Sequence, residues 1–197
     1  MKLTNWLFHP FDRLAGFKAL VLGLVFLALS VALVTWFKAR YDGVLNLHFF
    51  ETVIWSAVAQ DQILNALCLL VFLGGSNYLL SKCKPRLIDL SGTLILAMAP
   101  MTLLPLQNAN GALSDLSATV AQEPTAALNV LQLISPAQLI FSTVFSLALL
   151  AYHVYLLFKA YQICGDFKGP KLGLSFALAL LLAFTASLFT QHQLLPL

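Results

Sequence analysis

Residues 82–100 read "KCKPRLIDLSGTLILAMAP", in which a cluster of positive charge is followed by a long apolar run. A helix needs about 20 mostly apolar residues to cross a bilayer core about 30 Å thick, and the residues after Arg86 have that character. One acidic residue, Asp89, lies just inside the run. The stretch therefore predicts a membrane-spanning helix, and it raises the question of what a carboxylate does there.

The rest of the chain has the same character. Of its 197 residues, 60% are hydrophobic and 10% are charged, whereas soluble domains carry about 25% charged residues. Apolar runs bounded by charged or turn residues predict five spans, at about 19–37, 62–81, 87–106, 139–158 and 172–190. In the third span Pro100 and Pro105 each lack a backbone donor, which predicts a kink in its distal half. The expected fold class is an all-α membrane protein, a five-transmembrane-helix bundle that forms a single domain over 1–197.

Basic residues lie mostly at one set of span ends. Nine of the eleven fall on one side, namely Lys2, Arg13, Lys18, Lys82, Lys84, Arg86, Lys159, Lys168 and Lys171. Lys38 and Arg40 fall on the other side, together with most of the acidic residues. Because cytoplasmic loops carry the excess of Lys and Arg, the N-terminus is expected in the cytoplasm and the C-terminus outside.

Two long connections, 38–61 and 107–136, are expected on the outer side. In the second, Leu113, Leu116 and Val120 recur at helical spacing, and a similar set follows Pro124. This pattern predicts two short amphipathic helices on the outer membrane surface. A mobile loop is the alternative.

Three strongly polar side chains fall inside the predicted spans, at Asn77, Asp89 and His153. Buried polar groups are costly unless they find partners, so these three form a candidate polar cluster in the cytoplasmic leaflet. A structural interpretation stands beside each. Asp89 follows Pro85 by four residues, where a carboxylate suits the first turn of a helix. Asn77 suits an interhelical hydrogen bond, and His153 continues a stripe of small residues typical of helix packing.

Motifs for chemistry are weak. The three cysteines show no metal-ligand spacing, and no phosphate-binding or dinucleotide motif is present. "GLSF" at 173–176 resembles the serine motif of rhomboid proteases, but no later span supplies a histidine. We therefore expect no catalytic residues, no metal site, no cofactor and no enzymatic activity. The scattered basic residues also speak against nucleic acid as a partner.

The five-span layout, "RLIDLSGTLILAMAP" in the third span and "CGDFKGPKLGLSFALALLLA" before and within the fifth resemble bacterial members of the Yip (Ypt-interacting protein) family. Eukaryotic relatives carry a long cytosolic N-terminal region with a DLYGP-like motif, and they bind Rab-type GTPases. Here "HPFDRLAGFKAL" leads into the first span without that motif, so GTPase binding is not carried over. The resemblance implies a five-helix Yip-like bundle in the bacterial inner (cytoplasmic) membrane.

These features favour a non-enzymatic scaffold or accessory subunit for membrane organisation or trafficking. Its expected partners are the lipid bilayer and other integral membrane proteins, with a homo-oligomer as a further option. The main alternative is a small transporter, channel or lipid-handling subunit in which Asn77, Asp89 and His153 line a polar half-cavity open to the cytoplasm. An intramembrane enzyme is a third hypothesis.

Overall fold

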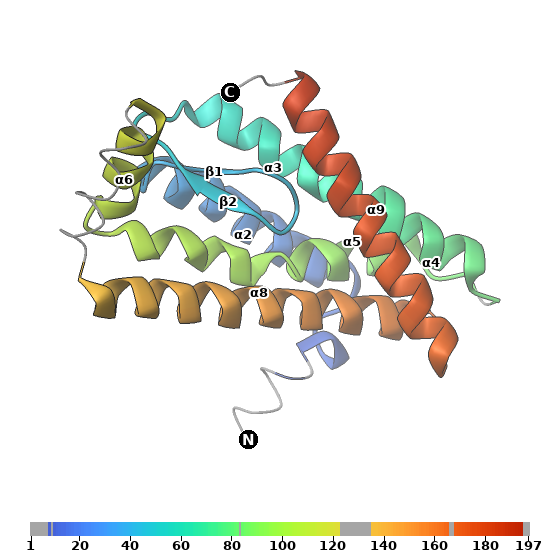
Figure 1. The fold of residues 1–197 in the computed structure, drawn as a ribbon. Coiled ribbons are helices and arrows are strands. Elements are labelled where there is room, and N and C mark those ends of the chain that lie inside the picture. Colours follow the sequence, from blue (N-terminus) through green and yellow to red (C-terminus); the bar gives the residue numbers. More distant parts are fainter. Residues whose placement is uncertain (1–7, 9, 83, 123–134, 166–167, 195–197) are drawn as a thin grey trace.

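The computed structural model describes residues 8, 10–82, 84–122, 135–165 and 168–194 (Figure 1). Five helical segments in these ranges are long and apolar enough to cross a membrane. They are Gly16–Trp36, Trp55–Leu80, Leu87–Asn108, Pro136–Cys164 and Pro170–Gln193. Each contains most of one predicted span, so the prediction of a five-helix, multi-pass membrane protein is confirmed at this level.

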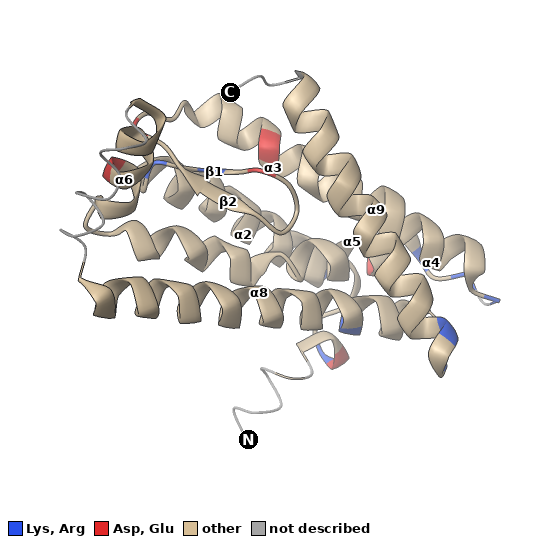
Figure 2. Cartoon of the chain, in the orientation of Figure 1, with Lys and Arg blue, Asp and Glu red and all other residues tan. Residues whose placement is uncertain are grey.

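The first, fourth and fifth of these segments are regular helices: α2 (Gly16–Trp36), α8 (Pro136–Cys164) and α9 (Pro170–Leu194). A short 3-10 turn, η1 (Pro10–Asp12), precedes α2. Lysine and arginine gather mostly at one end of the bundle, where α8 ends and α9 begins (Figure 2). We call this the basic end. The opposite end, where α2 stops and α6 lies, is called the hairpin end.

The second segment changes its winding along its length. It consists of α3 (Trp55–Leu69), a π turn η2 (Leu70–Gly74) and α4 (Gly75–Leu80). A π turn inserts one extra residue per turn, and such turns often occur at functional sites. Because α3 begins at Trp55, the helix is longer than predicted at the hairpin end and includes Asp61.

The third segment changes from α5 (Leu87–Leu96) to a 3-10 helix, η3 (Ala99–Asn108). Pro100 and Pro105 have no N–H group, so regular i to i−4 bonding cannot continue past them. The Met101 N–H donates to Met98 O (3.0 Å) in 3-10 fashion. The prolines predict a kink in this half of the span, and the structure has a tighter 3-10 helix there. At the junction with α5 this change leaves the Ala97 carbonyl group without its α-helical donor.

Helices α2 and α5 run side by side from the basic end with their backbones very close (Figure 1). A Cβ atom added to Gly23 would lie 2.8 Å from the Leu96 nitrogen, and one added to Gly92 would lie 2.7 Å from the Gly16 carbonyl oxygen. Neither position has room for a side chain. Glycines thus allow the first and third spans to approach one another in the manner of small-residue membrane interfaces.

The connection at 38–61 corrects the all-α expectation. It contains two antiparallel strands, β1 (Ala39–Tyr41) and β2 (Leu47–Phe49), which pair in the register Arg40 with His48. The turn between them enters the helix bundle, where the Asn65 side-chain amide donates to the Gly43 carbonyl oxygen (3.1 Å). Asn65 lies about 15 Å along α3 from Trp55. Non-helical backbone is tolerated at such a position because the protein itself supplies its hydrogen-bond partners.

The second long connection contains a helix, α6 (Ala112–Gln122). The Asn108 side-chain oxygen accepts bonds from the Leu113 (2.9 Å) and Ser114 (3.2 Å) nitrogens, so it caps the start of α6. A location of α6 at the membrane surface stays a prediction. The second amphipathic helix, predicted after Pro124, lies outside the described residues.

Candidate functional site

Asn77 joins the second span to the fourth. Its side-chain amide donates to the Tyr161 carbonyl oxygen (2.6 Å) near the end of α8, and its side-chain oxygen accepts from the Ser81 hydroxyl (3.2 Å). The residue is completely buried. Its donor and its acceptor are thus both engaged within the protein, as an interhelical hydrogen bond requires.

His153 occupies the break in the third span. Its Nδ1 lies 2.8 Å from the Ala97 carbonyl oxygen, and because a carbonyl only accepts, Nδ1 carries the hydrogen. In a regular helix Ala97 O would accept from Met101 N–H, which here is engaged with Met98 O. His153 therefore replaces a helical donor. Its Nε2 atom is buried and finds no hydrogen-bond partner within the described ranges.

Asp89 lies between the starts of two helices. It is in the first turn of α5, and its Oδ1 atom is 2.8 Å from the place where a Cβ on Gly16, the first residue of α2, would be. Gly16 has a φ of 61°, which favours glycine. Unpaired N–H groups give a helix start partial positive charge, so this position stabilises the carboxylate. The Asp89 carboxylate therefore lies beside the N-termini of both α2 and α5.

The structure does not join these three side chains. No hydrogen bond among the described residues connects any two of them. His153 and Tyr161, the partner of Asn77, are eight residues apart on α8, which corresponds to about 12 Å along the helix. Helix α8 continues to Cys164, beyond the end of the predicted fourth span, so His153 lies deeper than expected. Asn77 and His153 are held by hydrogen bonds to different spans, and Asp89 lies apart from both at the starts of α2 and α5.

Arg40 and Asp61 form an ion pair that the sequence reading missed. Arg40 Nε lies 3.0 Å from Asp61 Oδ2 and Arg40 Nη2 lies 3.2 Å from Oδ1, which is a two-pronged arrangement. The side chains are 17% and 1% exposed. The predicted second span, 62–81, leaves Asp61 in the connection before it. Asp61 instead lies within the helix, where Arg40 from β1 offsets the cost of burying its charge.

A chain of hydrogen bonds runs from the second span through the hairpin to the third. Gln62 Nε2 donates to Ser30 Oγ (2.8 Å), which lies 3.0 Å from the Tyr41 hydroxyl. Tyr41 donates to the Met101 carbonyl oxygen (2.8 Å), so the Ser30 hydroxyl must donate to Tyr41. Burial raises the pKa of Tyr41 to about 12. The four bonded groups therefore have a single fixed donor direction.

The hairpin turn is held by the second and fifth spans. Besides the bond from Asn65 to Gly43, the Val44 nitrogen donates to Ser187 Oγ (3.2 Å) on α9. Gln191 Nε2 donates to Asn65 Oδ1 (3.3 Å). Gly43 has a φ of 97°, and a Cβ there would lie 3.2 Å from Ser187 Oγ, so glycine is required. These contacts fix the position of the hairpin inside the bundle.

The space beside the ion pair is small. Arg40, Asp61, Gln191 and His192 help to line a cavity of about 20 Å³, which is room for roughly one water molecule. Among the described residues, no three His, Cys, Asp or Glu side chains gather as metal ligands would. The arrangement is suited to holding the hairpin rather than to binding a substrate.

Two signals in the sequence point toward this network. Asp61, Gln62 and Asn65 lie within one turn of a helix and share a face. Ser187 and Gln191 are spaced by four residues within the otherwise apolar fifth span. Polar stripes on apolar helices indicate buried polar partners. The sequence does not show that those partners come from a β-hairpin.

The fold and these contacts define a multi-pass α-helical membrane protein with a β-hairpin whose turn is held between its helices. Comparisons of the chain with protein-family models, with curated proteins and with solved structures find no match.

Proposed function

We propose that the protein is a non-enzymatic integral membrane protein that serves as a scaffold or accessory subunit for other membrane proteins. The observation that carries this proposal is the engagement of Asn77 and His153. Each donates to a backbone carbonyl oxygen of another span, at Tyr161 and Ala97. Polar groups used in this way hold helices together, as a structural helix bundle requires.

The outer faces of the helices also support this role. Several apolar side chains on α8 and α9 are exposed, for example Phe141 (63%) and Leu181 (58%). In a membrane these faces contact either lipid or the helices of another protein. They offer room for an integral partner or for a second copy of the chain.

The proposal includes a location and an orientation. The bacterial inner membrane follows from the Yip-like resemblance, and a cytoplasmic basic end follows from the positive-inside rule. Reporter enzymes fused after residue 197 and after residue 122 test the orientation. Activity of a reporter that works only outside the cytoplasm is expected at both positions, and cytoplasmic activity at both would contradict the proposed orientation.

Photo-crosslinking in native membranes tests the scaffold role. A photoreactive amino acid replaces Phe141 or Leu181 on exposed faces, and Leu157, which is completely buried, serves as the control position. A small set of integral proteins, or a second copy of the chain, should be crosslinked from at least one exposed position and not from Leu157. Adducts with lipid alone from both exposed positions would count against the proposal.

A catalytic role has its own test. If the purified protein turned over a lipid or peptide, and Asp89→Ala or His153→Ala abolished turnover without unfolding, the non-enzymatic proposal would be lost. The transporter alternative requires Asn77, Asp89 and His153 to line one cavity. The separate hydrogen bonds of Asn77 and His153, to Tyr161 O and Ala97 O, provide no support for that arrangement.

A further inference from the structure

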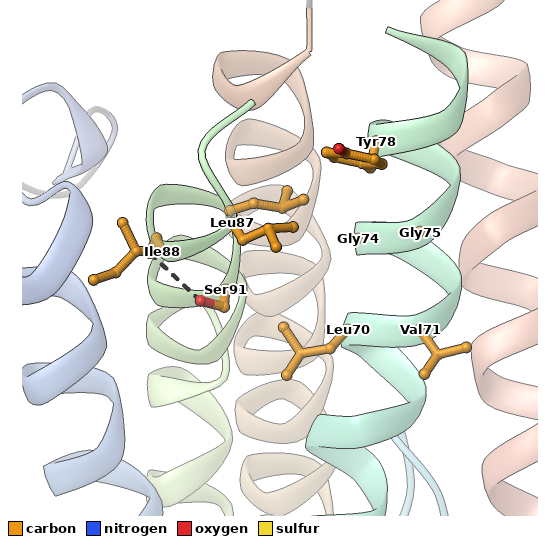
Figure 3. A pocket seen from close by; sticks show the side chains of 9 residues that line it. Leu70, Val71, Gly74, Gly75, Tyr78, Leu87, Ile88 and Ser91 are labelled. Carbon is orange, nitrogen blue, oxygen red and sulfur yellow. Dashed lines mark hydrogen bonds between the residues drawn. The ribbon is translucent and has the colours of Figure 1, made fainter. Parts of the chain in front are cut away.

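Two grooves flank the second span near the basic end. The first, about 470 Å³, lies between this span and α5 (Figure 3). Its labelled lining includes Leu70, Gly74, Gly75 and Tyr78 on one side, with Leu87 and Ile88 on the other. The second, about 1210 Å³, lies between the second span and α9. Val71 and Gly75 line both grooves.

The second groove has a strong chemical gradient along its length. Leu79, Leu174, Leu178 and Leu182 contribute to its apolar walls. The groove is lined at the basic end by Lys82, just after the second span, and by Lys168 and Lys171, beside the start of the fifth. The distance from Lys171 to Leu182 along α9 is about 16 Å, close to half of a hydrocarbon core about 30 Å thick. The groove therefore matches one leaflet, with positive charge where lipid headgroups lie.

We propose that this groove binds an anionic phospholipid, with the phosphate group at Lys82, Lys168 and Lys171 and an acyl chain along the leucines. Three lysines select a negatively charged headgroup over a zwitterionic one. Helix α9 begins at the same place, and its partial positive charge acts in the same sense. The apolar walls select a lipid over a soluble phosphate.

Gly75 keeps the groove open. A Cβ atom added at this glycine would meet nothing within 4 Å, in contrast to Gly23 and Gly92. A large side chain at position 75 can therefore extend into the groove without displacing the backbone. This makes Gly75→Phe a substitution that fills the site while leaving the helix packing in place.

Native mass spectrometry of the full chain in detergent micelles tests the charge contribution, with phosphatidylglycerol and phosphatidylcholine as probes. Wild-type protein should retain phosphatidylglycerol preferentially. The triple variant Lys82→Gln, Lys168→Gln, Lys171→Gln should lose at least about tenfold in that preference, since each lysine near an anionic headgroup contributes roughly fivefold. The matched control removes three other charges from the same end, with Lys18→Gln, Lys84→Gln and Arg86→Gln. It should change the preference less than about threefold.

Two further variants locate the bound lipid. Gly75→Phe should weaken phosphatidylglycerol binding at least about fivefold, whereas Ser91→Phe, which fills only the first groove, should leave it unchanged. An unchanged preference in the lysine variant, an equal loss in the charge control or an equal loss in Ser91→Phe would each overturn the proposal. Displacement of the lipid by glycerol phosphate at an equal concentration would also overturn it, because the acyl chain would then contribute nothing. Circular dichroism and gel filtration confirm that each variant is folded.

Discussion

The Tyr41 hydroxyl donates a hydrogen bond of 2.8 Å to the Met101 carbonyl oxygen, the group that the N–H of residue 105 would bond in a regular α-helix. Residue 105 is proline and has no N–H group. A side chain from the hairpin thus adds a hydrogen bond to a carbonyl group of the 3-10 helix η3, at the point where a proline rules out the α-helical bond. One turn closer to the basic end, His153 bonds to Ala97 O, whose α-helical donor, the Met101 N–H, is engaged with Met98 O.

Tyr41→Phe should lower the free energy of unfolding by about 1 to 3 kcal/mol, because it removes a buried hydrogen bond to the Met101 carbonyl and leaves the Ser30 hydroxyl without its acceptor. Unfolding in mixed micelles of a mild and a denaturing detergent measures the change. The control is Tyr155→Phe, which removes an exposed hydroxyl bonded to Phe8 O. Its effect should stay within about 0.5 kcal/mol. Equal effects of the two substitutions would contradict the proposed importance of the Met101 bond.

The raised pKa of Tyr41 predicts that the folded protein loses stability in alkali. This pKa is raised to about 12 by burial, whereas an unfolded tyrosine ionises near pH 10. Between these pH values the unfolded chain has lost this proton and the folded chain has kept it, so stability falls as pH rises. The advantage of wild type over Tyr41→Phe should therefore shrink by about 2 kcal/mol from pH 10 to pH 12. A constant difference across that range would show that Tyr41 ionises equally in both states.

Breaking the ion pair from either side should be costly. Asp61→Leu leaves the Arg40 charge without its partner, and Arg40→Met leaves the more deeply buried Asp61 charge alone, so each should destabilise the fold by about 3 to 5 kcal/mol. The double variant should be more stable than Arg40→Met, because no buried charge remains. Asp42→Asn is the control, since Asp42 is more exposed than Asp61 and its contact with His48, at 3.8 Å, is longer than a hydrogen bond. Strictly additive effects in this double-mutant cycle would be inconsistent with a coupled pair.

Replacement by alanine should affect stability differently at the glycines between α2 and α5 and at Gly75 in the second span. Gly23→Ala and Gly92→Ala place a Cβ within 3 Å of neighbouring backbone and should each destabilise by about 1 to 3 kcal/mol. Gly75→Ala has open space and should be neutral or stabilising by up to about 1 kcal/mol, because alanine favours helix more than glycine does. Thermal unfolding in detergent compares the three. A destabilising Gly75→Ala would show that this glycine is needed for more than space.

The five spans could be predicted because each is a local property of the chain. Lys18, Lys82 and Lys171 lie close to ends of spans, and the apolar runs beside them have the length that a bilayer requires. The break in the third span was also readable, since Pro100 and Pro105 act on their own helix. The ends of the spans were harder to predict, because a charged residue such as Asp61 indicates a span boundary unless its buried partner is known.

The hairpin and its network could not be predicted because they depend on distant partners. Its strands have three residues each, too few to show an alternating pattern. Asp61 can stay buried only because Arg40, 21 residues earlier, reaches it. The depth of His153 was predicted from a span end at residue 158, whereas α8 continues to Cys164, so a shared depth for Asn77 and His153 stays a prediction.

The hairpin turn also sets an order of events during synthesis. Val44 bonds to Ser187, which is 143 residues later in the chain. At roughly 5 to 20 residues per second, translation takes about 7 to 30 seconds to cover that distance. Throughout this interval the hairpin turn of the nascent chain lacks its contact with α9. The last span to be synthesised is therefore the one that completes the fold around the hairpin.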